Sequence, residues 1–183
     1  MNVGVRGVVV TGASTGIGRA CALDLAARGW RVFGGVRRET DGQRLRDESG
    51  GTITPLALDV TDSAQIAEAA RQVGDALGDG PLVGLVNNAG IAVTGPLEFV
   101  PLDDLRRQLE VNVVGQLAVT QAFLPLLREG RGRIVNMSSI SGRVAFPALG
   151  AYAASKFALE GLSDALRMEL KTQQISVSIV EPG

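Results

Sequence analysis

The sequence predicts an α/β fold in which helices cover both faces of a doubly wound parallel sheet. Three observations lead to this prediction. Short apolar, often β-branched runs alternate with helical segments six times along the chain. A glycine-rich turn joins the first run to the first helix, and Asp, Asn or Ser residues follow several later runs where each ends. Because no linker, repeat or low-complexity segment interrupts the chain, we expect residues 1–183 to form one domain.

The first element is a β-branched run, Val8–Val10, which predicts a buried strand. It is followed by Thr11–Gly18, with the sequence TGASTGIG, and by an amphipathic segment, Arg19–Arg28, which Gly29 ends as a C-terminal cap. A strand, a glycine turn and a helix in this order form the unit that binds dinucleotides in Rossmann folds. The sequence therefore predicts a nucleotide site at the start of this helix.

Three glycines of this turn each have a physical use. The missing side chain at Gly12 lets the chain turn tightly. Bare backbone at Gly16 and Gly18 lets a pyrophosphate approach the helix N-terminus, where free N–H groups and the helix dipole favour anions.

A second strand, Arg31–Val36, ends in Arg37 and Arg38. In a Rossmann unit this place, roughly 20 residues past the first glycine, usually carries an acidic residue for the ribose hydroxyls of NAD. Two cations instead suit a 2′-phosphate, which favours NADP(H). The alternative is a pair of solvated arginines, and an NAD(H) enzyme then fits as well. A polar helix, Glu39–Glu48, is expected next.

The third strand is expected at Thr52–Leu58, followed by a helix that Thr61 or Asp62 caps and that runs to about residue 77. Asp59 then lies at the carboxyl edge of the sheet, where ligands of open α/β folds collect. Two roles stay open for its side chain, contact with an adenine or formation of the turn.

The fourth strand, Leu82–Val86, runs into Asn87–Gly90, again at a carboxyl edge. A single long helix is expected over Leu102–Arg128, with acidic residues in its first turn and an arginine in its last. Asn112 falls in the middle of this helix, where asparagine is a mediocre helix former, so its side chain either faces solvent or has a function. The expected apolar stripe consists of Leu102, Leu105, Leu109 and Val113.

The fifth strand, Arg133–Met137, delivers two serines at its carboxyl end. A helix over residues 151–171 follows, and the sixth strand, Ser176–Val180, ends in Glu181–Gly183. With right-handed crossovers, these elements predict the strand order 3-2-1-4-5-6.

Composition excludes several classes of protein. A chain with 45% hydrophobic residues can bury a sizeable core, and a net charge of −1 without a basic run argues against nucleic-acid binding. Because the chain has no histidine, Ser-His-Asp chemistry and histidine metal sites are excluded, and no metal site is expected. The single cysteine, Cys21, forms no intrachain disulfide, and no apolar run approaches the length of a membrane span or resembles a signal peptide. We therefore expect a cytoplasmic protein without a membrane span.

Tyr152 and Lys156 are four residues apart, so on a helix they share a face and can approach the same point. A tyrosine is ordinarily a poor base, with a pKa of about 10, but an ammonium held beside it favours the phenolate. A phenol in this setting can give or take a proton near neutral pH, as a general acid/base must. Ser139, from a different element, could hydrogen-bond the same substrate oxygen.

Seven motifs stand in register along the chain. They are Thr11–Gly18, Asp59-Val60, NNAG at Asn87–Gly90, Asn112, Ser139, Tyr152-x-x-x-Lys156 and Pro182-Gly183. In order and spacing, over essentially the whole chain, they resemble the short-chain dehydrogenase/reductase family. The glycine spacing is similar to that of its oxidoreductase branch, and residues 32–38 resemble alcohol dehydrogenases of the steroid, retinol or hydroxyacyl type.

This resemblance implies a role for each matching position. Tyr152 would be the proton donor or acceptor, Lys156 would support it and hold the nicotinamide ribose, and Ser139 would orient the substrate oxygen. Asn112 would hold a water that links the lysine to solvent. The cofactor-binding set would be Gly12, Ser14, Thr15, Gly16, Ile17 and Gly18 at the phosphates, Arg37 and Arg38 near the 2′-phosphate, Asp59 and Val60 at the adenine, and Asn88, Ala89 and Gly90 at the ribose, with Tyr152, Lys156, Pro182 and Gly183 completing it.

The implied activity is NADP(H)-dependent interconversion of a small apolar secondary alcohol and a ketone by hydride transfer, with NAD(H) as the alternative cofactor. Relatives commonly form homodimers or homotetramers through the helices that correspond to residues 102–128 and 151–171. Family members also usually continue past the Pro-Gly into a substrate-covering loop and a seventh strand. We therefore expect this chain to be part of a longer protein. The alternative is a truncated, catalytically impaired dinucleotide-binding fragment, with its sixth strand as an exposed edge.

Overall fold

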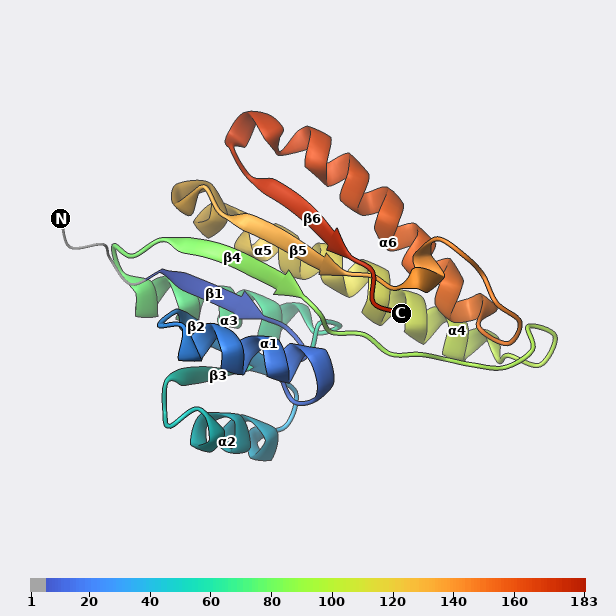
Figure 1. Ribbon diagram of the computed structural model, residues 1–183, viewed down its shortest axis with the longest axis horizontal. Helices are drawn as coiled ribbons and strands as arrows, with labels where there is room; N and C mark the ends of the chain where they lie inside the picture. Colours follow the sequence, from blue (N-terminus) through green and yellow to red (C-terminus); the bar gives the residue numbers. More distant parts are fainter. Residues whose placement is uncertain (1–5) are drawn as a thin grey trace.

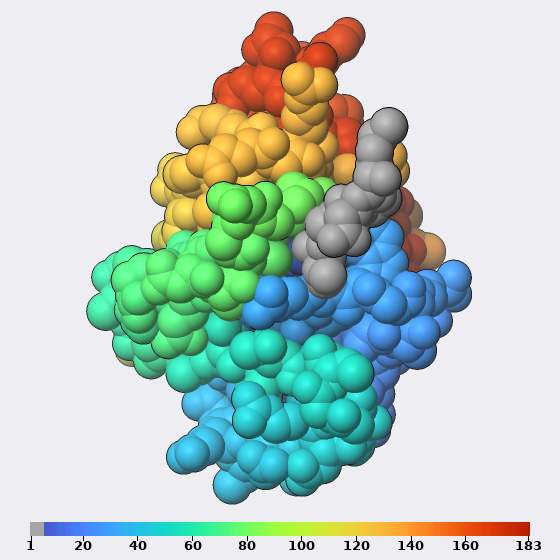
Figure 2. Space-filling model, turned by 90° about the vertical axis from the view of Figure 1, so that its left-hand side faces the viewer, coloured from blue at the N-terminus to red at the C-terminus, as the bar shows by residue number. Residues whose placement is uncertain are grey.

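The computed structural model describes residues 6–183, in which six parallel strands form one sheet in the order β3-β2-β1-β4-β5-β6 (Figure 1). The strands are β1 (Gly7–Val10), β2 (Arg31–Val36), β3 (Ile53–Ala57), β4 (Leu82–Asn87), β5 (Arg133–Met137) and β6 (Ser176–Val180). Each neighbouring pair runs parallel. Figure 2 follows the same order, because the colours pass from cyan at the bottom through blue and green to orange and red at the top. The predicted fold class and strand order are confirmed.

Helices cover both faces of the sheet, as predicted. They are α1 (Gly16–Ala27), α2 (Glu39–Glu48), α3 (Ser63–Leu77), α4 (Leu102–Leu109), α5 (Gly115–Gly130) and α6 (Gly150–Glu169). Alternate residues of β1 divide the core between the two faces: Val9 packs in the cluster under α3 and α5, whereas Val8 and Val10 face α1 and α2. Because β1 is buried on both sides, it consists of an uninterrupted apolar run.

The long helix predicted over residues 102–128 is present, as a continuous helical stretch from Leu102 to Gly130, but it contains a π-helical turn. α4 passes into a π-helical turn, Glu110–Val114, before α5 continues. The predicted leucine stripe is also not the buried face, since Leu102 is 63% exposed whereas Gln108 and Asn112 are completely buried. These amides face the segment that leaves β4, whose backbone groups need hydrogen-bond partners. The predicted apolar stripe was therefore wrong here, because contacts with a distant segment select the polar face.

Within residues 6–183, the continuous helical stretch Leu102–Gly130 is long and apolar enough to cross a membrane, with a mean hydropathy of 1.2 over its most apolar window. In this fold the same stretch covers the sheet, and Val119, Phe123 and Leu127 are completely buried in the core. A core helix can satisfy the same criteria of length and composition. The expectation that nothing in the chain approaches a membrane span therefore holds for uninterrupted apolar runs but not for this helix.

Candidate active site

The glycine turn after β1 leads into α1 and packs against the chain that leaves β4. Gly12 and Gly16 have φ angles of 63° and 56°, a region that favours glycine. A Cβ added to Gly12 would lie 2.8 Å from Cα of Ala89, and one added to Gly18 would lie 2.2 Å from Nδ2 of Asn88. Gly18 is therefore required by close packing inside the loop. Gly16, by contrast, has open space around it within the described residues, as an approaching ligand would need.

Thr11 and Asn88 join the carboxyl ends of β1 and β4. The backbone N–H groups of Asn88 and Ala89 each donate to Oγ1 of Thr11 at 3.0 Å. Nδ2 of Asn88 donates in turn to the carbonyl oxygens of Thr11 at 3.0 Å and Gly12 at 3.1 Å. The strand order reverses between these two strands, so this is the topological switch point at which open α/β sheets bind ligands.

The start of α1 is left open. Thr15 precedes the helix as its N-cap residue and makes no side-chain cap hydrogen bond with the described part of the chain. The side chain of Asp62, in contrast, caps α3 by accepting hydrogen bonds from the N–H groups of Ala64 and Gln65. Of the two caps predicted for α3, Thr61 and Asp62, the structure therefore selects Asp62. The uncapped N–H groups of α1 remain available to an anion.

Two adjoining cavities open at this edge of the sheet. Their volumes are about 210 Å³ over the glycine turn and about 460 Å³ over the carboxyl end of β5, and both are lined by Asn88, Gly90 and Ile91. Of the predicted site residues, the first cavity is lined by Gly12, Ser14, Thr15, Arg37, Asp59, Val60, Asn88, Ala89 and Gly90. The second is lined by Gly16, Ile17, Asn88, Gly90, Ser139, Tyr152, Lys156, Pro182 and Gly183. The structure thus brings together all the predicted positions except Gly18, Arg38 and Asn112, which line neither cavity.

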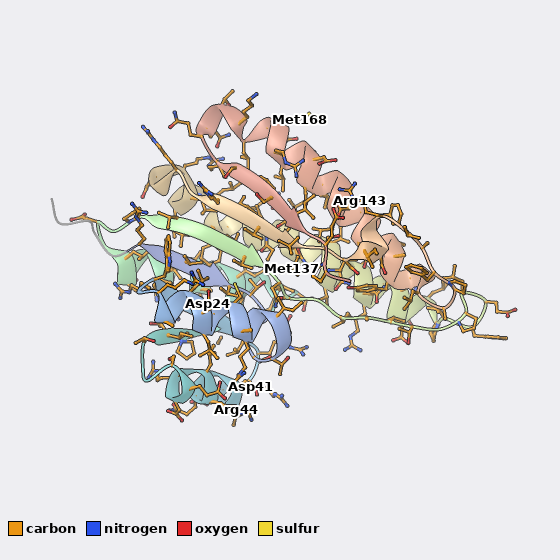
Figure 3. All side chains as sticks on the ribbon, in the orientation of Figure 1. Asp24, Asp41, Arg44, Met137, Arg143 and Met168 are labelled. Carbon is orange, nitrogen blue, oxygen red and sulfur yellow. The ribbon has the colours of Figure 1, made fainter. Side chains whose placement is uncertain are left out.

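Arg37 and Arg38, predicted as a pair, both line a cavity of about 480 Å³ beside α2, but their other surroundings differ. Arg37 lines the first cavity. Nε of Arg38 instead donates to Oδ2 of Asp41 at 2.9 Å, and the Arg38 side chain is 77% exposed. Asp41 also lies 3.8 Å from a nitrogen of Arg44, and Figure 3 shows both residues on α2. Of the two, only Arg37 therefore also faces the cavity over the glycine turn.

Asp59 forms the turn after β3 and also lines the first cavity. Its Oδ1 accepts hydrogen bonds from the backbone N–H of Thr61 at 2.9 Å and from the Thr61 hydroxyl at 2.7 Å. Its own N–H donates to Oε1 of Gln65 at 2.9 Å. The turn role that the sequence left open is thus present in the structure, and the carboxylate stands at the cavity wall at the same time.

Lys156 and Tyr152 come from the first turns of α6 and line the second cavity together. The lysine is only 4% exposed, and its Nζ donates to the carbonyl oxygen of Met137 at 2.7 Å. Nζ also lies 5.6 Å from the centre of the Tyr152 ring. Burial lowers the pKa of Lys156 to about 8, and the negative charge of Glu160 acts in the opposite direction. The helical spacing therefore places an ammonium beside the phenol, as the sequence predicted.

Ser139 lies in the turn after β5, close to the last residues of the chain. Its Oγ accepts a hydrogen bond from the N–H of Ser141 at 3.1 Å and donates to the carbonyl oxygen of Pro182 at 3.5 Å. The N–H of Ile140 donates to the same carbonyl at 2.9 Å. Pro182 is therefore held against the serine turn by two contacts, which places both at the mouth of the second cavity.

Asn112 lies in the π-helical turn and is completely buried. Its Oδ1 accepts from the N–H of Ile91 at 2.8 Å, and its Nδ2 donates to the Ile91 carbonyl at 2.8 Å and to Oγ of Ser155 at 3.0 Å. The Ser155 hydroxyl donates in turn to the carbonyl of Tyr152 at 2.7 Å. The Asn112 side chain thus joins the segment after β4 to the helix of the tyrosine.

Gln108 and Gln116 lie one helical turn to either side of that asparagine, and the sequence analysis missed both. Oε1 of Gln108 accepts from the N–H of Val93, and Nε2 of Gln116 donates to the carbonyl of Ala89 at 3.0 Å. Four residues of α-helix rise about 6 Å, close to the ~6.6 Å span of two extended residues, so the three amides match alternate residues of the segment 89–93. Polar side chains repeated at a spacing of four in an apolar helix were the signal that could have identified them.

The sheet order, the glycine turn and the cavity at the switch point together define a Rossmann-type α/β protein. The family model for short chain dehydrogenases matches residues 6–183, and the chain belongs to this family.

Comparisons with known proteins agree with this assignment. The 3-amino-tetrahydro-pyrrolizinone reductase of Xenorhabdus hominickii is 44% identical over 178 residues, which cover 97% of this chain and 61% of that protein. The 17-beta-hydroxysteroid dehydrogenase type 6 of Homo sapiens is 44% identical over 96% of this chain and 56% of its own length. The retinol dehydrogenase 5 of Mus musculus is 40% identical over 96% of this chain and 55% of its own length. The chain therefore spans between 55% and 61% of the length of these curated relatives.

Two solved structures share the fold closely. A short-chain dehydrogenase from Streptomyces avermitilis superposes with a TM-score of 0.91 at 39% identity, and the match covers 98% of this chain and 65% of that one. A metagenomic short-chain oxidoreductase, solved in complex with NADP, superposes with a TM-score of 0.89 at 35% identity, covering 97% of this chain and 82% of its own.

Proposed function

We propose that this chain forms the nucleotide-binding and catalytic part of an NADP(H)-dependent oxidoreductase that interconverts a small, apolar secondary alcohol and a ketone. The observation that supports it most is the pair of adjoining cavities. The glycine turn and Arg37 line one, and Ser139, Tyr152 and Lys156 line the other. The curated relatives are named as dehydrogenases and reductases, which fits this reaction class.

The first cavity has the donors and the shape for the adenosine end of the cofactor. The open N-terminus of α1 lies where the two cavities adjoin: Gly12, Ser14 and Thr15 line the first, and Gly16 and Ile17 line the second. Bare backbone at Gly16 suits the pyrophosphate at this junction. Arg37 suits the 2′-phosphate, a role for which Arg38 is less suited because of its ion pair with Asp41. In this proposal Asp59 and Val60 border the adenine, and Asn88, Ala89 and Gly90 border a ribose.

The second cavity has the groups for proton transfer. When bound, NADPH would supply the hydride to the carbonyl carbon of the substrate. As negative charge develops on the substrate oxygen, the Tyr152 hydroxyl donates its proton to that oxygen and becomes a phenolate. The ammonium of Lys156 stabilises this phenolate, and Ser139 donates a hydrogen bond to the same substrate oxygen. The present bond from Ser139 to the Pro182 carbonyl is 3.5 Å long, so it is weak and easily exchanged for a substrate.

A titration of the chain with NADPH and with NADH, followed by nicotinamide fluorescence, tests the cofactor assignment. We expect NADPH to bind at least about tenfold more tightly, since a hydrogen-bonded charge pair with the 2′-phosphate contributes about 1.5–3 kcal/mol. Arg37→Gln should remove this preference and leave NADH affinity within about twofold. Arg38→Gln is the matched control and should leave both affinities nearly unchanged.

Each other outcome is informative. Equal affinities in the unmodified chain, with no effect of Arg37→Gln, would assign the protein to NAD(H). If only Arg38→Gln loses the preference for NADPH over NADH, Arg38 and not Arg37 contacts the 2′-phosphate. Failure of both nucleotides to bind would refute a nucleotide site in this chain.

Self-association through α4, α5 and α6 is also part of the proposal. Large apolar side chains on this helical layer remain exposed, namely Leu102, Val114, Phe157 and Met168. Exposed apolar surface of this kind favours contact with a second copy. Sedimentation velocity should show a dimer or tetramer, and Phe157→Asp should shift it towards the monomer. A cytoplasmic location is likewise proposed, because the single cysteine fits a reducing compartment.

A further inference from the structure

A buried carboxylate that the proposed chemistry does not use lies one helical turn beyond Lys156. Glu160 is 6% exposed, and neither of its carboxylate oxygens accepts a hydrogen bond within residues 6–183. Burying a charged carboxylate without compensation is strongly unfavourable, so a carboxylate in this position needs positive charge nearby. Two basic side chains provide it.

The first is Arg143, from the loop that follows the Ser139 turn. One of its guanidinium nitrogens lies 3.1 Å from Oε2 of Glu160 and 2.8 Å from Oε1 of Glu181, the residue after β6. Figure 3 shows Arg143 beside α6 and Met137 at the end of β5. Arg143 thus ties together the serine loop, the helix of Lys156 and the end of β6. Its own side chain is 57% exposed, whereas the carboxylate of Glu160 stays buried.

The second is Lys156 itself. Residues four apart on a helix have Cβ atoms about 5–6 Å from each other, so Lys156 and Glu160 occupy the same face of α6. The lysine is buried and donates to the carbonyl of Met137. Burial disfavours its charge, and Glu160 is the group that acts against this effect.

Close packing fixes the position of the carboxylate. A Cβ at Gly142 would lie 2.9 Å from Oε1 of Glu160 and 2.7 Å from Oγ of Ser138. The glycine therefore lets the serine loop rest directly on the carboxylate. Any larger residue there would push the loop and the helix apart.

We propose that Glu160 is a positioning residue, a buried counter-charge held by Arg143 that keeps Lys156 protonated in its water-poor site. The titratable groups that act on or lie beside the lysine are Tyr152 and Glu160, both on α6. Arg143 of the serine loop contacts Glu160 and Glu181, and the charge of Asp164 also acts on Arg143. Among these, Glu160 is the buried anion on the same helical face as the ammonium. The inference rests on the proposed function only where it calls Lys156 catalytic.

The chain allows a direct test, because Lys156 and Lys171 are its two lysines. With ¹³C-labelled lysine, the ε-carbon shift of each can be followed by NMR against pH, and Lys171→Arg identifies the signals. Glu160→Gln should lower the titration midpoint of Lys156 by about one unit, while exposed Lys171 should not change. Glu169→Gln, an exposed glutamate on the same helix, is the matched control and should shift neither midpoint.

The direction in which the Lys156 midpoint shifts distinguishes the loss of the Glu160 charge from a loosening of the packing around the lysine. A loosened site would admit water and move the Lys156 midpoint upwards, towards the 10.5 of a solvated lysine. An unchanged or raised midpoint in Glu160→Gln, or an equal fall in Glu169→Gln, would overturn the proposal. This measurement needs neither cofactor nor substrate. Failure of NADPH to bind would therefore contradict the proposed function but would not affect the proposal that Glu160 is the counter-charge of Lys156.

Discussion

Replacing Lys156 by methionine should stabilise the folded chain at neutral pH although it removes the proposed catalytic ammonium. Burial lowers the pKa of this lysine from 10.5 to about 8. Because the pKa is lower in the folded state, the folded chain holds the Lys156 proton less tightly than the unfolded chain. At a pH where the lysine is charged in both the folded and the unfolded state, this difference lowers the free energy of unfolding by about 3 kcal/mol. Methionine removes that penalty and gives up the hydrogen bond to Met137, worth about 1 kcal/mol. The expected net gain is about 2 kcal/mol.

The pH dependence follows from the same shift. Between about pH 8 and 10.5 the folded lysine has lost its proton and the unfolded one still carries it, so the unmodified chain gains stability as pH rises. The advantage of Lys156→Met is therefore full below pH 8 and disappears towards pH 10.5. Urea unfolding at pH 7 and pH 10, followed by the fluorescence of Trp30, the single tryptophan, measures both values. Exposed Lys171→Met is the control. A variant less stable than the unmodified chain at pH 7, or an equal gain at both pH values, would refute the reasoning.

Four further predictions concern the site and helix α6. Gly18→Ala should lower NADPH affinity more than tenfold and destabilise the chain by about 1–3 kcal/mol, since its Cβ would lie 2.2 Å from a neighbouring amide nitrogen. Gly161→Ala, with open space around it in the described structure, should stabilise α6 by up to about 1 kcal/mol in the same urea unfolding assay. Asn112→Ala should cost about 2–4 kcal/mol of unfolding free energy because it leaves both backbone groups of Ile91 unpaired; a loss below 1 kcal/mol would contradict the assigned hydrogen bonds. Tyr152→Phe should abolish turnover of ketones by the protein and leave NADPH affinity within about twofold; retained turnover would exclude the proposed proton donor.

The sequence alone predicted the elements whose signals are local. The apolar run Val8–Val10, the glycines of Thr11–Gly18 and the Tyr152–Lys156 spacing each depend on neighbours a few residues away. Backbone sterics and helical or strand periodicity act at that range, so they leave a visible pattern. Handedness rules then reduce the possible sheet orders to very few, which is why the order of all six strands was predictable.

Tertiary structure alone decided which polar groups meet across segments distant in sequence. The adjacent arginines Arg37 and Arg38 are alike in the sequence, and only the fold places one at the cavity and the other against Asp41. The amides of α4, the π-helical turn and α5 pair with a segment 15 to 27 residues earlier in the chain, and Arg143 reaches both Glu160 and Glu181. Such pairs have no sequence period, because their partners are set by how the layers pack. The burial that lowers the pKa of Lys156 has the same origin, since its desolvation comes from the strand and loop packed over α6.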